Sequence, residues 1–158
     1  MSSPFIQYLS ALAIALATVG IIGISSAQAA QNHHQKPTPI PFDKGHIATT
    51  ITGKLPSAQS EHWYQFDAIK GQYAVVNLAP LTKQTQRVPE TANVGVLHMP
   101  DGSQDGNKGG IIYQGCLPMS GTYRLRIARN LMATQNQAAG YSAEIVVLPQ
   151  YASQALCQ

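Results

Sequence analysis

Formal charge is scarce in this chain of 158 residues, and the first 30 residues contain none of it. Charged residues make up 11% of the sequence, against roughly 25% in an average soluble protein, although the hydrophobic share of 44% is ordinary. So little charge excludes a charge-rich disordered chain and a long solvated helix or coiled coil. The net charge of +3 is also too small and too scattered for a nucleic-acid binder, which gathers several Lys and Arg on one face.

Motifs of catalytic and metal sites are missing as well. No histidine belongs to an H-E-x-x-H motif, and Ser120 stands in P-M-S-G-T rather than in the G-x-S-x-G context of an activated serine. Asp101 to Asn107 carries oxygen-bearing side chains at alternate positions, as a calcium loop begins, but Ile112 occupies the position of the closing acidic residue. His33 and His34 are expected to be solvated, with weak binding of a transition metal as the alternative. We therefore expect no enzyme, no cofactor and no metal site.

The uncharged start of the chain predicts an export signal. An apolar run from Leu9 to Ile24 is followed by small residues that contain the cleavage pattern Ala27-Gln28-Ala29. Residues 1–29 are therefore expected to be a signal peptide, cleaved after Ala29 or Ala30. The segment before the run lacks Lys and Arg, so an uncleaved membrane anchor is the alternative, but the run is shorter than the ~20 residues that a spanning helix needs.

Two cysteines, Cys116 and Cys157, lie in the part that remains after cleavage. An exported chain meets an oxidising compartment, where an even number of cysteines indicates a disulfide. This bond would close about 40 residues and stabilise the fold by on the order of 4 kcal/mol. Two free thiols or a metal-binding pair are the alternative, although neither cysteine has a histidine beside it. Because no cysteine lies near the cleavage site to take a lipid, we expect a soluble protein that does not contact the membrane.

After cleavage about 128 residues remain, which is enough for one domain with a hydrophobic core but not for two. Residues 30–45 contain three prolines and few apolar residues. Prolines at this spacing favour extended, unpaired backbone, so this segment is predicted to be a flexible Pro-rich arm. Residues 46–158 are predicted to form the folded domain.

Hydrophobic residues of this domain alternate with period two, which is typical of half-buried β-strands. In residues 122–129, for example, Tyr123 and Leu125 fall on one face and Arg124 on the other. About seven such segments are separated by turn signals: residues 46–54, 61–68, 73–78, 93–99, 111–115, 122–129 and 141–148. Residues 103–110 are rich in glycine and are expected to be a loop. The pattern predicts an all-β protein, a single antiparallel β-sandwich of about seven strands.

A set of short motifs points to a family. From Gly115 the chain runs GCLPMSGTYRLRIARN, and it closes with GYSAEI from Gly140. Earlier segments, ITGKL, HWYQFDAIKGQYAVVNL and VLHMPDG, follow the same outline more loosely. Together these motifs resemble the periplasmic lysozyme inhibitors of the invertebrate-type and goose-type classes, within the wider group of bacterial pre-peptidase C-terminal domains. The resemblance covers residues 47–148 and implies a β-sandwich.

The resemblance also implies a function. In inhibitors of this type a Ser-Gly-x-Tyr loop enters the active-site cleft of the lysozyme, and here the matching loop is Ser120-Gly121-Thr122-Tyr123. The protein is therefore expected to be a periplasmic inhibitor of a lysozyme or a related peptidoglycan hydrolase. Such a cleft contains carboxylates, to which a serine hydroxyl can hydrogen-bond, while a glycine lets the backbone approach closely.

The partner-binding residues expected on this basis are Ser120, Gly121, Tyr123, Arg124, Arg126 and Arg129. The arginines would supply charge-assisted hydrogen bonds to acidic groups of the partner. A purely structural role is the alternative, in which Gly121 serves a turn and Tyr123 the core. The arginines would then belong to an ordinary solvated face.

Trp63 falls on the outward face of its expected strand. It would anchor a partner or stack on a sugar, or else pack beneath the N-terminal arm. A second class of function stays open, because a shared fold does not decide activity. In that alternative the protein is an accessory module that binds polysaccharide or steadies an envelope assembly without inhibiting any enzyme.

Overall fold

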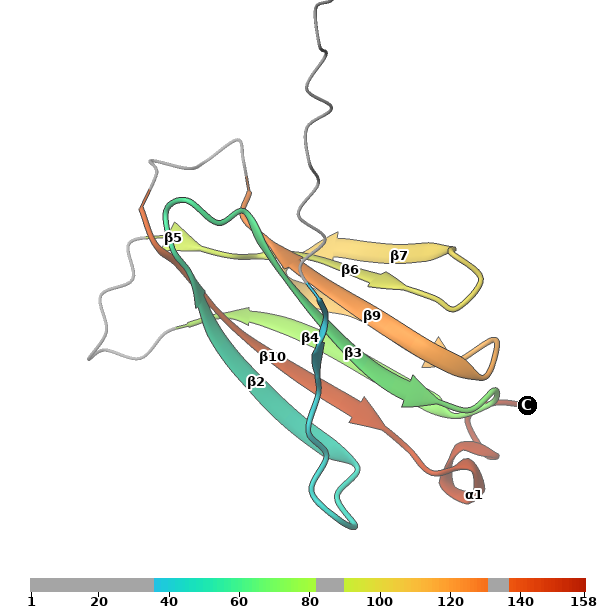
Figure 1. Ribbon diagram of the computed structural model, residues 1–158. Helices are drawn as coiled ribbons and strands as arrows, with labels where there is room; N and C mark the ends of the chain where they lie inside the picture. Colours follow the sequence, from blue (N-terminus) through green and yellow to red (C-terminus); the bar gives the residue numbers. More distant parts are fainter. Residues whose placement is uncertain (1–35, 82–89, 131–136) are drawn as a thin grey trace, which may run out of the picture. The chain divides into compact units, whose positions relative to one another are not determined.

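The computed structural model describes residues 36–81, 90–130 and 137–158 (Figure 1). The predicted signal peptide, residues 1–29, lies outside the described residues. Within them, no helix is both long enough and apolar enough to cross a membrane. The elements are β1 (Thr38–Pro39), β2 (Ala48–Leu55), β3 (Glu61–Ala68), β4 (Tyr73–Pro80), β5 (Glu90–Thr91), β6 (Val94–His98), β7 (Gln104–Lys108), β8 (Gly110–Cys116), β9 (Gly121–Ala128), β10 (Ala139–Val147) and the short helix α1 (Gln150–Ser153).

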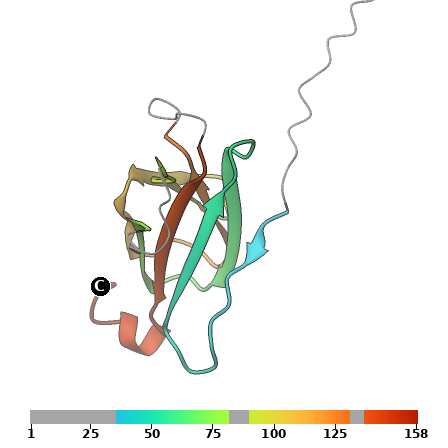
Figure 2. The ribbon, with the colours of Figure 1, turned by 90° about the vertical axis from the view of Figure 1, so that its left-hand side faces the viewer.

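These strands form two sheets that pack face to face as a sandwich (Figures 1 and 2). One sheet has the order β1-β3-β9-β6-β7, and the other has the order β2-β10-β4-β8, with β5 beside β10. Neighbouring strands are antiparallel except where β1 meets β3 and where β5 meets β10. The predicted all-β, antiparallel sandwich is confirmed.

The core lies between the two sheets and is built from the inward faces that the period-two pattern predicts. On β9 the side chains of Tyr123, Leu125 and Ile127 are at most 1% exposed, and on β10 Tyr141 and Ile145 are fully buried. Each large apolar side chain buried in this way contributes about 1.5–3 kcal/mol. Because β9 is also hydrogen-bonded to β3 on one side and β6 on the other, the segments at its two ends are held firmly.

The Pro-rich arm is not unpaired over its whole length. Thr38 and Pro39 pair in parallel with β3, and the backbone N–H of Ile40 donates to the carbonyl of Gln65 at 2.8 Å. Figure 2 shows this short strand beside β3. The prolines stand at alternate positions, so the N–H groups between them are free to face β3, and prolines are tolerated on an edge strand. Ile40 enters the core at 7% exposure, which the proline count did not predict.

The expected Gly-rich loop at residues 103–110 is wrong in its centre, because Gln104 to Lys108 form β7. This strand pairs with β6 as a hairpin, and all of its side chains are exposed. A strand at the edge of a sheet with no buried face shows no alternation in its sequence. At the hairpin turn, a carboxylate oxygen of Asp101 accepts hydrogen bonds from the N–H and hydroxyl of Ser103, at 2.9 and 2.6 Å. These bonds lower the pKa of Asp101.

Candidate functional site

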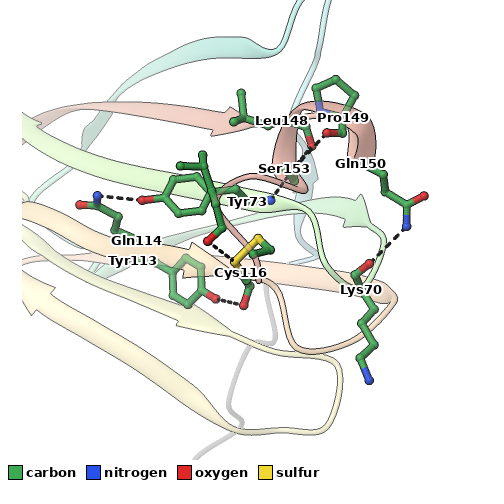
Figure 3. Close-up of a disulfide and its surroundings, with 11 residues drawn as sticks. Lys70, Tyr73, Tyr113, Gln114, Cys116, Leu148, Pro149, Gln150 and Ser153 are labelled. Carbon is green, nitrogen blue, oxygen red and sulfur yellow. Dashed lines mark hydrogen bonds between the residues drawn. A yellow bond between two sulfur atoms is a disulfide. The ribbon is translucent and has the colours of Figure 1, made fainter.

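The turn between β8 and β9 leads into the Ser-Gly-x-Tyr motif, and its backbone is fixed at its start, at Leu117. The N–H of Leu117 donates to the carbonyl of Gln72 at 2.8 Å, and the N–H of Gly71 donates to the carbonyl of Leu117 at 2.9 Å. Just before the turn, Cys116 forms a disulfide with Cys157 (Figure 3). The predicted disulfide is confirmed, and it ties the C-terminal tail to the end of the sandwich that presents the turn.

Ser120 lies exposed in this turn. Its Oγ accepts a hydrogen bond of 3.0 Å from the backbone N–H of Lys70, which belongs to the neighbouring turn between β3 and β4. Next to it, the hydroxyl of Thr122 donates to a carboxylate oxygen of Asp67 at 2.6 Å. A serine hydroxyl has one proton and two lone pairs. Because Lys70 uses a lone pair, the O–H of Ser120 remains able to donate to another molecule.

Tyr123 supports the turn from inside the core. Its side chain is fully buried and stacks on Phe66 with ring centroids 5.6 Å apart, and its hydroxyl donates to the carbonyl of Met119 at 2.7 Å. Burial raises the pKa of this hydroxyl, so it remains a neutral donor. A partner cannot touch this ring without unfolding the sandwich, and the expected direct contact is replaced by a positioning role.

Gly121 is required by both conformation and space. Its φ is +143°, which favours glycine, and a Cβ built on it would lie 3.0 Å from side-chain atoms of Pro100. The Ser120 turn therefore packs closely against the turn from Met99 to Gly102.

The three arginines after the turn have three different environments. Arg124 is exposed on the outer face of its sheet. Arg126 is half-buried and pairs with Glu61, with 3.2 Å between Nη1 and Oε2. Arg129, also expected to bind a partner, follows the opposite end of β9, away from the turn.

Arg129 is only 6% exposed. Its guanidinium donates to the carbonyls of Leu55 and Gln59, each at 2.8 Å, and to those of Pro56 and Gln137. An arginine carries five N–H donors, and here several of them satisfy backbone acceptors where β2 and β3 are connected. This residue stabilises the fold and offers no contact to a partner.

A groove opens on the outer face of the same sheet, beside the Ser120 turn. It has a volume of about 720 Å³, and its lining is Lys36, Pro37, Trp63, His98, Met99, Pro100, Gly102, Thr122 and Arg124. The rings of Trp63 and His98 contact each other with centroids 4.9 Å apart, and the indole N–H of Trp63 donates to Glu61 at 2.7 Å. Lys36 and Pro37, at the start of the arm, form one wall of the groove. Trp63 is half-buried.

His98 is a member of this groove that belongs to no recognisable sequence motif. Burial lowers its pKa first, the positive charges of Arg126 and Arg124 lower it further, and Glu61 partly opposes them. The imidazole is therefore neutral at pH 7. Its Nε2 is buried and has no hydrogen-bond partner within the described ranges. The alternation of Val94 to His98 is a signal that would place His98 on the same face as Arg124, its cross-strand partner on β9.

Within the part of the chain that the structure describes, no group of three or more His, Cys, Asp or Glu side chains is arranged to hold a metal ion. The site therefore consists of a hydrogen-bonding turn and an adjoining cationic, partly aromatic groove. Such an arrangement is suited to binding, because its side chains donate hydrogen bonds and carry positive charge.

No protein-family model matches the sequence, and no curated protein matches it. Solved structures do match. PliG of Salmonella Typhimurium, a periplasmic inhibitor of g-type lysozyme, is 23% identical with a TM-score of 0.55, over 72% of this chain and 99% of that one. PliG of Aeromonas hydrophila, with the same description, is 17% identical with a TM-score of 0.53, over 71% and 96%. The pre-peptidase C-terminal domain of a Bacillus anthracis collagenase is 16% identical, with a TM-score of 0.47.

The two inhibitors confirm the predicted resemblance at the level of the fold. Their sequence identities to this chain are low, so the likeness concerns the β-sandwich itself.

Proposed function

We propose that this protein is a periplasmic inhibitor of a lysozyme or a related peptidoglycan hydrolase, and that it blocks the sugar cleft of its target with the Ser120-Gly121-Thr122-Tyr123 turn. The observation that carries the proposal is the exposed hydroxyl of Ser120 on a turn that hydrogen bonds at Leu117, Met119 and Ser120 hold in place. A periplasmic location is supported by the predicted signal peptide and by the two periplasmic inhibitors that share the fold.

The chemistry of the turn suits a cleft lined with carboxylates. The catalytic groups of most lysozyme-like glycosidases are Asp and Glu, and the O–H of Ser120 is free to donate to such a group. Gly121 has no side chain to obstruct the approach of its backbone. Arg124 stands exposed two residues after Thr122 and adds positive charge on the same face. A positive patch facing an acidic cleft speeds association and favours the correct orientation.

The rigidity of the turn supports tight binding. Tyr123 anchors it to the core, Lys70 and Thr122 link it to the β3–β4 region, and the Cys116–Cys157 disulfide holds its start. A loop that is already ordered loses little conformational entropy when it binds. Arg126 and Arg129 act in this proposal as positioning residues, because each is already engaged within the fold.

The test is an assay of the mature protein against chicken-type, goose-type and invertebrate-type lysozymes. We expect at least one of them to be inhibited at micromolar concentration, and Ser120→Ala to weaken that inhibition at least about tenfold, which corresponds to one charge-assisted hydrogen bond. Ser57→Ala is the matched control, because Ser57 is an exposed turn serine between β2 and β3, at the other end of the sandwich.

Two results would count against the proposal. If all three lysozymes keep full activity at micromolar concentration of the protein, it is not an inhibitor of these enzymes. If one lysozyme is inhibited equally by the wild type, Ser120→Ala and Ser57→Ala, the inhibitory surface lies elsewhere on the molecule.

A further inference from the structure

The groove beside the Ser120 turn has a chemistry of its own. We propose that it binds a sugar ring that bears a carboxylate, with the ring on Trp63 and the carboxylate at Arg124 and Lys36. The groove shares Thr122 and Arg124 with the surface proposed for inhibition, but Ser120, which carries that proposal, does not line it.

The charges that line the groove favour an anionic ligand. Its described lining includes two cationic side chains, Lys36 and Arg124, and no Asp or Glu. The carboxylates beside the groove are already engaged: Glu61 accepts from the indole N–H of Trp63 and from Nη1 of Arg126, and Asp67 accepts from the hydroxyl of Thr122. Asp101 accepts from Ser103. Neither Lys36 nor Arg124 forms an ion pair within the residues that the structure describes. A bound carboxylate would therefore meet positive charge that the fold leaves uncompensated.

The apolar part of the groove favours a flat, partly apolar ligand. Trp63 is half-buried there, with Pro37, Met99 and Pro100 around it, and its ring is held in place by His98 at 4.9 Å and by its bond to Glu61. The C–H face of a pyranose is flat and apolar, whereas its hydroxyl groups and carboxylate lie at the edge. The hydroxyl of Thr122, at the groove wall, already donates to Asp67, so its oxygen can accept from a sugar hydroxyl.

The size of the groove fits a small ligand. Its volume of about 720 Å³ lies in the range of sites for small molecules, roughly 300–1,000 Å³. The groove is bounded by three strands of one sheet, by the hairpin turn after β6 and by the start of the arm. These walls are concave and combine one aromatic face with converging donors, which is typical of a small-molecule site rather than of a flat protein interface.

Trp63 makes the proposal directly measurable, because it is the only tryptophan of the chain. The intrinsic fluorescence of the mature protein is titrated with the disaccharide of N-acetylglucosamine and N-acetylmuramic acid, and in parallel with the neutral disaccharide of N-acetylglucosamine. The two ligands differ mainly by the carboxylate-bearing substituent. We expect a saturable change with the acidic disaccharide and at least about tenfold weaker binding of the neutral one.

Variants separate the groove from the turn. Arg124→Gln should weaken binding of the acidic disaccharide about tenfold, whereas Lys54→Gln, at an exposed position on β2 in the other sheet, should leave it unchanged. Ser120→Ala should bind the acidic disaccharide as the wild type does, even if it no longer inhibits a lysozyme. A variant can thus lose inhibition and keep sugar binding.

Equal binding of the two disaccharides, or binding of neither, would overturn the proposal. So would a fluorescence response that Arg124→Gln leaves intact. If no sugar binds but Trp63→Phe and Arg124→Gln abolish inhibition of a lysozyme, the groove is a contact surface for the enzyme and the assignment to a sugar is wrong.

Discussion

The two ends of strand β9 use similar residues for opposite purposes. At its start, Ser120 and Arg124 point to solvent, while the backbone of the turn is held by contacts beneath it. At its end, Arg129 is buried and its guanidinium is surrounded by backbone carbonyls. The difference shows that side-chain chemistry alone does not assign a role. The groups that surround a side chain in the fold decide whether it can contact a partner.

The largest loss of stability is expected from substitution of Arg129, at the end of β9. Arg129→Met would leave several carbonyls without donors, two of which, on Leu55 and Gln59, are bound at 2.8 Å. Each buried acceptor left unpaired costs about 1–3 kcal/mol, so the free energy of unfolding should fall by about 5 kcal/mol. Urea denaturation of the mature protein measures this. Arg124→Met is the control and should change stability by less than about 0.5 kcal/mol, because its side chain is exposed.

A loss at Arg129→Met no larger than that of the control would contradict the comparison. In that case the carbonyls would be hydrogen-bonded to other groups or to water. The end of β9 would then tolerate substitution as well as its start does.

The disulfide gives the second-largest effect, and it acts at the other end. Cys116 and Cys157 are 41 residues apart, and a loop of this length contributes about 4 kcal/mol by restricting the unfolded chain. The double variant Cys116→Ser, Cys157→Ser should therefore melt at a lower temperature, and added reductant should lower the melting temperature of the wild type but not of the variant. A wild type that melts at the same temperature with and without reductant would show that the disulfide adds no stability.

Much of the fold could be predicted from the sequence, because a buried face leaves a period-two pattern. The limits of β3 were predicted to the residue, and the inward face of β9 was predicted correctly. The strands that the pattern did not predict are β1, β5 and β7. β5 has two residues, and β1 and β7 are the two edge strands of one sheet. In β7 no side chain is buried, and in β1 the prolines mask a pairing made by the intervening residues.

The site could be predicted only in part. A local motif reveals Ser120 and Gly121, because four adjacent residues form the turn. The burial of Arg129 depends on carbonyls of Leu55 and Gln59, more than 60 residues earlier in the chain, which no local pattern reports. The groove likewise combines His98 with the start of the arm, and only the strand order brings them together.

An effect of intermediate size is expected at Gly53, which belongs to the Arg129 end. A Cβ at this position would lie 2.1 Å from the hydroxyl oxygen of Tyr141, its cross-strand partner. Tyr141 cannot easily move, because it is fully buried and its hydroxyl is bonded to His62 and Tyr64 at 2.5 Å each.

Gly53→Ala should therefore lower the free energy of unfolding by about 2 kcal/mol, which is typical of overpacking in a core. Chemical denaturation measures the change, with Thr52→Ala at the neighbouring exposed position as the control. If the two variants unfold alike, the contact between strand and tyrosine is looser than the packing indicates.

The smallest effect on stability is expected from substitution of Ser120. This substitution also tests most directly whether the two ends of β9 have different roles. Ser120→Ala removes one exposed hydrogen bond, from the N–H of Lys70, and water can replace the lost acceptor. The free energy of unfolding should therefore change by about 0.5 kcal/mol, at the lower limit for a hydrogen bond. Inhibition by the same variant should fall at least about tenfold if the turn enters a sugar cleft. Measuring both quantities on one preparation separates a binding role from a structural one. A loss of stability comparable to that of Arg129→Met would mean that Ser120 holds the fold together, and the two ends of β9 would then serve the same purpose.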